Sequence, residues 1–363
     1  MNCPSGDSRF ASCATSTLRI IDANRNRAAE ALRVVEEFFR FGLDDAELTR
    51  LCKQLRHELA TLLSGIPEHL LCASRETATD VGTEVRVDDE YIRSTDREVA
   101  CSSWKRLQQA LRVLEEHMKV PAPETAALVE ALRYRSYSLE RCFQIAEHAR
   151  TVLGDVRLYV LIDGCDDVDS MVRLAQSLIE AGVHALQLRD KSLTDRQLVD
   201  AARKLRRVTA DRETLFVVND RPDVAVLSGA DAVHIGQEEL TVKDARAIVG
   251  PEMLIGVSTH SLQQARQAVI SGANYLGCGP TFPSTTKQFT TFAGLEFLTA
   301  VAGEIGLPAF AIGGIGPDNL SEVLATGVRR IAVGAAVTEA AQPEQAVRRL
   351  LEQLRTSPSR VSG

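Results

Sequence analysis

Apolar residues in the first 150 positions recur at intervals of three and four, the spacing of one face of an α-helix. The segment at 26–41, NRAAEALRVVEEFFRF, shows this spacing clearly. A similar segment, KRLQQALRVLEEHMKV, follows 79 residues later at 105–120. Each copy precedes a second arginine-rich helical segment, at 48–63 and at 125–147. The pattern therefore predicts two similar helical hairpins, packed as a bundle.

These hairpins predict an all-α helical domain of unknown role over residues 17–150, built from a duplicated helical hairpin. The residues before it, 1–16, lack a clear period and are expected to form a flexible tail. Between the two hairpins lies a polar, threonine-rich stretch, SRETATDVGTEV, at 74–85. It is interpreted either as an anion-binding or interface loop built on Arg75 and Thr77, or as an ordinary connection, the commoner role of such loops.

The pattern changes at residue 157, where short β-branched runs begin to alternate with amphipathic helical stretches. The eight predicted strands are 157–163, 184–190, 214–220, 232–236, 254–259, 275–280, 309–314 and 330–335. Eight such units within residues 155–356 predict an α/β domain in the form of a closed (β/α)8 TIM barrel. A doubly wound open sheet is the alternative, and the lack of a dinucleotide-binding fingerprint favours the closed barrel.

The composition is that of an ordinary globular protein, with 45% hydrophobic and 25% charged residues among 363. No run approaches the roughly 18 apolar residues of a membrane span, and no secretory signal opens the chain. We therefore expect a cytoplasmic protein with no membrane partner. The net charge of −7 argues against a nucleic-acid partner. The composition is compatible with a homo-oligomer as well as with a monomer.

Eight cysteines are scattered along the chain without any C-x-x-C pair. This distribution argues against a zinc site or a disulfide framework and fits a reducing compartment. Cys278, in a predicted strand, has no evident histidine partner and is interpreted as a packing residue. His234 is interpreted either as an acid–base group or as a buried histidine of the core, which is the commoner case.

Polar residues follow almost every predicted strand, where the active sites of (β/α)8 barrels lie. Asp220 and Glu239 end neighbouring strands, and two carboxylates without histidine or cysteine suit Mg²⁺. Arg189, Lys191 and Lys287 bring three positive charges to the same end of the barrel. A metal ion and three cations describe a pocket for a diphosphate leaving group. In the alternative interpretation, Asp220 caps the next helix and the cations are solvated.

Glycines predict a second anion site. Gly313-Gly314 and Gly334 end the last two predicted strands, where backbone N–H groups can approach a phosphate. Ser284, Thr285 and Thr286 lie on a long loop after the sixth strand, and their hydroxyls are also suited to bind phosphate. Two phosphate sites, one of them with a metal ion, indicate two substrates.

Taken in order, these motifs resemble the thiamine-phosphate synthase family. The matching segments are QLRDK (187–191), ND (219–220), HIGQEE (234–239), GVS (256–258), GPTFPSTTK (279–287) and AIGGI (311–315). The helical segment resembles the amino-terminal extension found on one branch of that family. The resemblance implies that the enzyme joins 4-amino-2-methyl-5-(diphosphooxymethyl)pyrimidine to a thiazole phosphate and releases pyrophosphate, with Mg²⁺ as cofactor.

The resemblance also implies roles for individual residues. The pyrimidine diphosphate would be bound by Gln187, Leu188, Arg189, Asp190, Lys191 and Asn219. Mg²⁺ would be bound by Asp220 and Glu239, and the diphosphate by Ser258 and Lys287. The thiazole phosphate would be bound by Ser284, Thr285, Thr286 and Gly314. The residues expected to carry catalysis are Arg189, Lys191, Ser258 and Lys287.

Two positions depart from the family pattern. Glu239 stands where the family usually has Asp, and Gly334-Ala335 stands where it often has a serine. The second change removes a hydroxyl from the expected thiazole-phosphate site. A related thiazole tautomerase is the alternative enzyme, but it is expected to lack the Asp220/Glu239 pair and Lys287. A ligand-binding regulator, with the helical domain reporting occupancy of the barrel, is the alternative outside enzymes.

Overall fold

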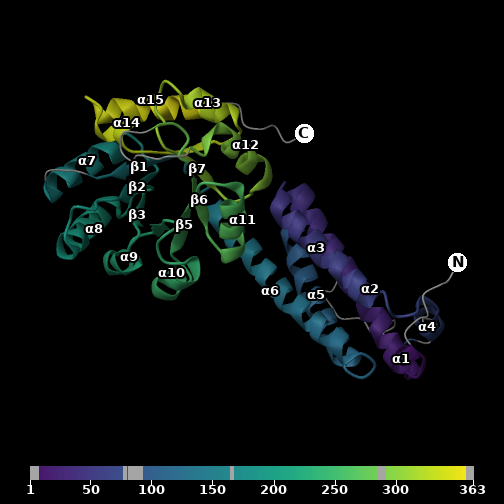
Figure 1. Cartoon of the computed structure of the whole chain (residues 1–363). Coiled ribbons are helices and arrows are strands. Elements are labelled where there is room, and N and C mark those ends of the chain that lie inside the picture. Colours follow the sequence, from purple (N-terminus) through teal and green to yellow (C-terminus); the bar gives the residue numbers. More distant parts are fainter. Residues whose placement is uncertain (1–7, 77–79, 81–92, 164–166, 284–291, 357–363) are drawn as a thin grey trace. The chain divides into compact units, whose positions relative to one another are not determined.

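The computed structural model describes residues 8–76, 80, 93–163, 167–283 and 292–356 (Figure 1). The chain divides into two compact units, Met1–Phe143 and Gln144–Gly363. The division falls inside one long helix, α6 (Pro123–Val152), whereas the sequence places the boundary at 150–155. In the part of the chain that is described, no helix has the length and apolar character needed to cross a membrane.

The first unit is all-helical, as predicted. Its elements are α1 (Ser8–Ala11), α2 (Thr15–Glu37), the π-helical turn η1 (Phe38–Gly42), α3 (Ala46–Leu63), α4 (Glu68–Ser74), α5 (Asp96–Met118) and the first part of α6. Two caps fix helix starts: the side chain of Asp45 accepts from Leu48 N before α3, and that of Thr95 accepts from Glu98 N before α5. Phe10 in α1 is buried, so this part of the expected tail packs against the protein.

Aromatic side chains hold the helical unit together. Phe39, Trp104 and Phe143 are fully buried, and the ring centroids of Phe39 lie 6.2 Å from Trp104 and 5.5 Å from Phe143. Large buried rings contribute most to such a core because each removes a large apolar area from water. The apolar stripe of 26–41 therefore faces the bundle interior, as its helical spacing predicts.

The second unit is a closed barrel of eight parallel strands in sequence order, β1 to β8, with β1 also paired to β8. The strands are β1 (Leu158–Ile162), β2 (Ala185–Leu188), β3 (Leu215–Asn219), β4 (Ala232–Ile235), β5 (Leu254–Thr259), β6 (Tyr275–Cys278), β7 (Ala309–Ile312) and β8 (Arg330–Val333). The helices are α7 (Val168–Glu180), α8 (Asp195–Thr209), α9 (Pro222–Ser228), α10 (Val242–Val249), α11 (Leu262–Ser271), α12 (Gly294–Glu304), α13 (Leu320–Ala325), α14 (Ala335–Thr338) and α15 (Pro343–Thr356). The predicted barrel is confirmed, and the open sheet is excluded.

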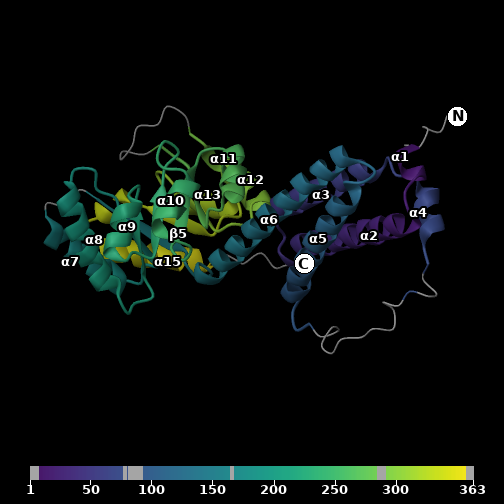
Figure 2. The ribbon, with the colours of Figure 1, turned by 90° about the horizontal axis from the view of Figure 1, so that it is seen from below.

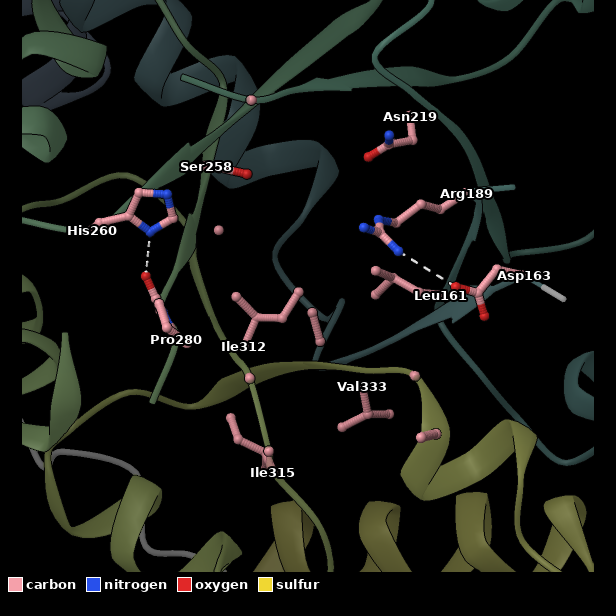
Figure 3. Close-up of a pocket in the computed structure, with 18 of the residues that line it drawn as sticks. Leu161, Asp163, Arg189, Asn219, Ser258, His260, Pro280, Ile312, Ile315 and Val333 are labelled. Carbon is pink, nitrogen blue, oxygen red and sulfur yellow. Dashed lines mark hydrogen bonds and ion pairs between the residues drawn. The ribbon is translucent and has the colours of Figure 1, made fainter. Parts of the chain in front are cut away.

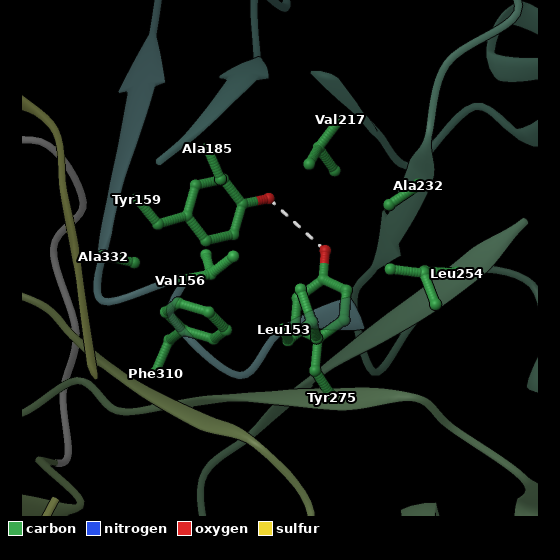
Figure 4. Close-up of a cluster of buried hydrophobic side chains, with 10 residues drawn as sticks. All are labelled: Leu153, Val156, Tyr159, Ala185, Val217, Ala232, Leu254, Tyr275, Phe310 and Ala332. Carbon is green, nitrogen blue, oxygen red and sulfur yellow. Dashed lines mark hydrogen bonds between the residues drawn. The ribbon is translucent and has the colours of Figure 1, made fainter. Parts of the chain in front are cut away.

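The helices lie around the outside of the strands (Figure 2). Tyr159, Tyr275 and Phe310 pack edge to face inside the barrel, with centroids 5.4–6.3 Å apart (Figure 4). Leu153 and Val156, from the segment entering β1, join this cluster. Apolar residues from the early part of most strands thus fill the amino-terminal half of the barrel. Space for ligands is left at the carboxyl ends of the strands, where the polar residues lie.

Candidate active site

A cavity of about 990 Å³ opens at the carboxyl ends of the strands (Figure 3). Seven of the sequence-predicted site residues line it: Arg189, Lys191, Asn219, Asp220, Glu239, Ser258 and Gly314. They come from five different strand ends, those of β2, β3, β4, β5 and β7, and the closed topology brings them together. The predicted residues Ser284, Thr285, Thr286 and Lys287 lie outside the described residues.

The segment predicted to bind the pyrimidine diphosphate, 187–191, has side chains on both faces of β2. Gln187 points to the interior, where its Nε2 donates a hydrogen bond to the hydroxyl of Tyr159 at 2.6 Å. Leu188 is buried on the other face because side chains alternate along a strand, and it does not line the cavity. Asp190 accepts hydrogen bonds from the backbone N (2.9 Å) and hydroxyl (2.6 Å) of Ser192, which shapes the loop after the strand.

Arg189 reaches into the cavity from the end of β2, and Asp163 from the end of β1 holds it (Figure 3). Arg189 Nη1 lies 3.4 Å from Asp163 Oδ2. Burial raises the pKa of Asp163 above its ordinary value, while Arg189 opposes that rise. None of the sequence motifs includes Asp163. Its signal was its position directly after the first strand, the same signal that identified the other site residues.

Asp220 and Glu239 converge on one backbone position, Gly236. A Cβ atom placed on Gly236 would lie 3.4 Å from Glu239 Cγ and 3.9 Å from Asp220 Oδ1. These are ordinary van der Waals distances, and they show that both side chains lie beside Gly236. Lys191 Nζ lies 3.9 Å from Asp220 Oδ2, so a cation faces the same carboxylate. The alternative that the Asp220 side chain caps α9 is not supported, since its described contact is with Lys191.

Ser258, at the end of β5, is hydrogen-bonded to a buried histidine. His234 Nε2 lies 3.0 Å from Ser258 Oγ, and His234 Nδ1 has no hydrogen-bond partner among the described residues. Glycines make room for the ring: a Cβ on Gly256 would lie 2.5 Å from Nδ1, and one on Gly277 would lie 3.0 Å from Cε1. Burial lowers the pKa of His234 to about 4, so the imidazole is neutral near pH 7.

A glycine turn after β7 forms another wall of the cavity. Gly313 and Gly314 have φ values of +101° and +64°, a region that favours glycine. A Cβ on Gly314 would lie 2.4 Å from the carbonyl oxygen of Pro283, so no other residue fits without a shift. Asn319 fixes the turn, donating to the Gly314 carbonyl and accepting from Gly316 N, both at 2.8 Å.

The cavity is also lined by His260, which belongs to none of the sequence motifs. His260 Nδ1 lies 2.5 Å from the carbonyl oxygen of Gly279, and because a carbonyl only accepts, Nδ1 carries the proton (Figure 3). Cys278, by contrast, is fully buried against Thr259, and burial raises its thiol pKa to about 12. A thiol with so high a pKa is a poor nucleophile, which agrees with its interpretation as a packing residue.

The polar connection after the first hairpin contains no free cation at Arg75. Its Nε and Nη2 donate to the carboxylate of Asp22 at 2.6 and 2.9 Å. This pairing satisfies the guanidinium and favours an ordinary connection over an anion-binding loop. The other residue singled out there, Thr77, lies outside the described residues.

Comparison with known proteins agrees with this geometry. The family model "Thiamine monophosphate synthase" matches residues 158–337, which span the barrel strands, and the ThiD2 family model matches residues 19–142. A thiamine-phosphate synthase of Rhodopirellula baltica is 44% identical, over 96% of this chain and 95% of its own length. The chain belongs to the thiamine-phosphate synthase family.

Other family members support the assignment. The thiamine-phosphate synthase of Gloeobacter violaceus is 42% identical over 93% of this chain and 96% of its own length. The solved structure of thiamine phosphate pyrophosphorylase from Pyrococcus furiosus is 36% identical and covers 55% of this chain and 96% of its own, with a TM-score of 0.51. Like the other thiamine-phosphate synthases, the protein is a transferase of thiamine biosynthesis.

Proposed function

We propose that this thiamine-phosphate synthase uses the cavity to join the pyrimidine diphosphate to the thiazole phosphate. The observation that carries the proposal is the division of the cavity between two kinds of anion-binding group. Arg189, Lys191 and Asn219 lie on β2 and β3, while the Gly313-Gly314 turn follows β7 on the opposite side of the closed barrel. One substrate diphosphate and one substrate monophosphate need such a division.

On the first side, charged and polar groups are suited to the diphosphate. Arg189, oriented by Asp163, presents a planar fork of N–H donors that matches phosphate oxygens. Lys191 adds a second cation, and Ser258 adds a hydroxyl held by His234. Gln187 lies deeper, and its amide is suited to hydrogen-bond the pyrimidine ring. Lys287 is proposed for the diphosphate on the sequence motif alone.

Mg²⁺ fits the donors that meet at Gly236. Asp220 and Glu239 offer carboxylate oxygens, the ligands this ion prefers, and the Cγ of Glu239 lies beside the same glycine as Oδ1 of Asp220. Within the described residues, no group of three or more His, Cys, Asp and Glu is placed to hold a metal. Two protein ligands leave positions for water and phosphate oxygens. When bound there, Mg²⁺ would neutralise charge on the leaving pyrophosphate.

The reaction needs no protein nucleophile. The bond between the pyrimidine methylene carbon and the diphosphate oxygen breaks, and its electron pair leaves with pyrophosphate. The amino group of the ring stabilises the resulting cation, and the thiazole nitrogen donates its lone pair to the methylene carbon. Arg189 and Lys191 stabilise the leaving group, while the glycine turn holds the thiazole phosphate close to the reacting carbon.

The remaining assignments belong to this proposal too. Ser284, Thr285 and Thr286 are proposed to bind the thiazole phosphate together with Gly314, and the backbone at Gly334-Ala335 lines the same cavity. A tautomerase is not favoured, because Asp220 and Glu239 are both present and converge. A regulator without activity has no need of this charged arrangement. Cytoplasmic location remains a prediction from the sequence, which does not decide between a monomer and a homo-oligomer.

The helical unit is proposed to be a duplicated hairpin. In the first hairpin, Arg56 Nε donates to Glu36 at 2.8 Å; in the second, Arg133 Nε donates to Glu115, also at 2.8 Å. Both glutamates occupy the same place in the repeated ALRxxEE segment. In each hairpin, an arginine of the second helix binds this glutamate, 20 residues further on in the first copy and 18 in the second, and the likeness supports a duplicated hairpin. The proposed role of the helical unit is interaction or oligomerisation, since its sequence contains no charged cluster that resembles a catalytic site.

The metal assignment is tested with Asp220→Asn and Glu239→Gln. Each should lower turnover at saturating substrates by about 10² and raise the Mg²⁺ concentration needed for half-maximal rate. Glu252→Gln is the matched control, because Glu252 is an exposed carboxylate before β5, at the other end of the barrel. Near-normal turnover and Mg²⁺ dependence in both site variants would refute the assignment.

A further inference from the structure

Asp220 has an unusual backbone conformation for a residue with a side chain. Its φ is +59°, in the left-handed region that non-glycine residues seldom adopt. Aspartate tolerates this region better than most residues, but the conformation persists only where the surroundings hold it. Asp220 N donates to the carbonyl oxygen of His234 at 2.7 Å, and Arg221 N donates to the carbonyl oxygen of Asn219 at 2.8 Å.

The next residue, Arg221, anchors this turn through its side chain. Its Nε and Nη2 donate to the carboxylate of Asp223 at 2.9 and 2.6 Å. Its Nη1 donates to Asp195 at 2.6 Å. All three guanidinium nitrogens are therefore engaged, and hydrogen bonding from Arg221 holds the pKa of Asp223 below its usual range.

The two carboxylates belong to different βα units. Asp195 is the first residue of α8, just after the loop that carries Arg189 and Lys191. Asp223 lies in the first turn of α9, just after the turn that carries Asn219 and Asp220. Arg221 therefore ties together two loops that supply the diphosphate side of the cavity, although Arg221 itself does not line the cavity.

We propose that Arg221 is a positioning residue for the metal ligand Asp220. By fixing the residue after Asp220 at three points, it holds the left-handed turn that directs the Asp220 carboxylate toward Gly236 and Glu239. The inference rests on the proposed metal site. Exposed ion pairs contribute little to stability. The ion pairs of Arg221 with Asp195 and Asp223 therefore act on the geometry of the site more than on the stability of the barrel.

The test compares binding of Mn²⁺, in the presence of inorganic pyrophosphate, to the full-length protein and to Arg221→Ala. Binding is followed by the loss of the free Mn²⁺ signal in electron paramagnetic resonance, beyond the loss that pyrophosphate causes without protein. Arg221→Ala should raise the dissociation constant about 10-fold, the lower end of the effect of losing a group that orients a metal ligand. Arg221→Lys, which keeps the charge without the fork, should recover part of the affinity.

Two controls separate positioning from a general loss of structure. Lys204→Ala, on α8, removes ion pairs with Asp169 on α7 and Asp200 on α8 and should leave Mn²⁺ binding unchanged. Asp223→Asn should weaken binding in the wild-type background but add little in the Arg221→Ala background. The thermal midpoint of Arg221→Ala and its KM for the thiazole phosphate should stay near the wild-type values.

The outcomes distinguish this inference from the proposed function. If the wild type binds Mn²⁺ and Arg221→Ala binds it equally well, the positioning role is wrong while the metal site stands. A loss of binding that follows a large drop in the thermal midpoint also overturns the positioning role. If the wild-type protein itself binds no Mn²⁺ with pyrophosphate, the metal site and the inference built on it both fail.

Discussion

His234 Nε2 lies 3.0 Å from the hydroxyl oxygen of Ser258, and this contact joins the barrel interior to the wall of the cavity. Because burial lowers the pKa of His234 to about 4, the ring stays neutral over the physiological pH range. A neutral ring that is held between Gly256 and Gly277 has little freedom to turn. It therefore fixes the direction of the Ser258 hydroxyl.

His234→Gln should raise the KM for the pyrimidine diphosphate by up to about 10-fold, the equivalent of one hydrogen bond, because the Ser258 hydroxyl loses its orientation. Ser258→Ala should have a similar effect, and the two changes together should cost little more than either alone. Steady-state kinetics with each substrate varied in turn provide the measurement. An equal rise in the KM for the thiazole phosphate would contradict this role.

Gly256→Ala should destabilise the barrel severely. The added Cβ would lie 2.1 Å from Tyr275 Cζ and 2.5 Å from His234 Nδ1, so packed side chains must move. The expected loss in the free energy of unfolding is about 3 kcal/mol, measured by denaturant titration. Gly303→Ala is the control: it lies in α12 with nothing within 4 Å of its Cβ, and it should stabilise by about 0.5–1 kcal/mol. Similar stability for the two variants would argue against this packing.

Tyr159→Phe tests whether the buried hydroxyl orients Gln187. Without the Tyr159 hydroxyl, the Gln187 amide loses a hydrogen bond of 2.6 Å and is free to rotate. The KM for the pyrimidine diphosphate should therefore rise several-fold. Tyr275→Phe is the matched control, because it also removes a buried hydroxyl. That hydroxyl lies 3.4 Å from the hydroxyl of Tyr159, whereas Gln187 bonds to Tyr159. Tyr275→Phe should have the smaller effect. Equal effects of the two variants would show that Gln187 is held in another way.

Asp22 and Arg75 should make the helical unit sensitive to acid. The hydrogen bonds from Arg75 lower the pKa of Asp22 below its ordinary value of 3.8. The folded state therefore binds fewer protons than the unfolded state, and the stabilisation is present above about pH 4 and lost as the pH falls through the folded pKa. At pH 7, Asp22→Asn should destabilise by about 1–2 kcal/mol, since the partner is half exposed.

The difference in the free energy of unfolding between the wild type and Asp22→Asn should shrink as the pH is lowered from 7 to 3. Thermal unfolding followed by circular dichroism at 222 nm measures it. A difference that is constant over this range would show that the ion pair does not stabilise the fold.

The sequence was sufficient to predict the barrel because its strands are short apolar runs between clearly amphipathic helices. It also placed Asp220, Glu239 and Arg189 at one end of the barrel, where they line the same cavity, since parallel strands in a closed barrel bring their carboxyl ends together. Similarly, the repeat at 26–41 and 105–120 predicted the two buried helices α2 and α5. These inferences depend on local pattern and on topology alone.

Contacts between distant residues could not be predicted in the same way. The pairing of His234 with Ser258 depends on empty space beside Gly256 and Gly277, which only the assembled strands create. The support of Arg189 by Asp163 depends on the contact between β1 and β2. The buried position of Phe10, within the segment expected to be a flexible tail, follows from tertiary packing that no local period records.

Pyrophosphate release from the purified protein tests the central claim most directly. The protein is given the pyrimidine diphosphate, the thiazole phosphate and Mg²⁺, and then each is omitted in turn. The account predicts release only when all three are present, with one thiamine phosphate formed for each pyrophosphate. Binding of both ligands without any release of pyrophosphate would contradict it.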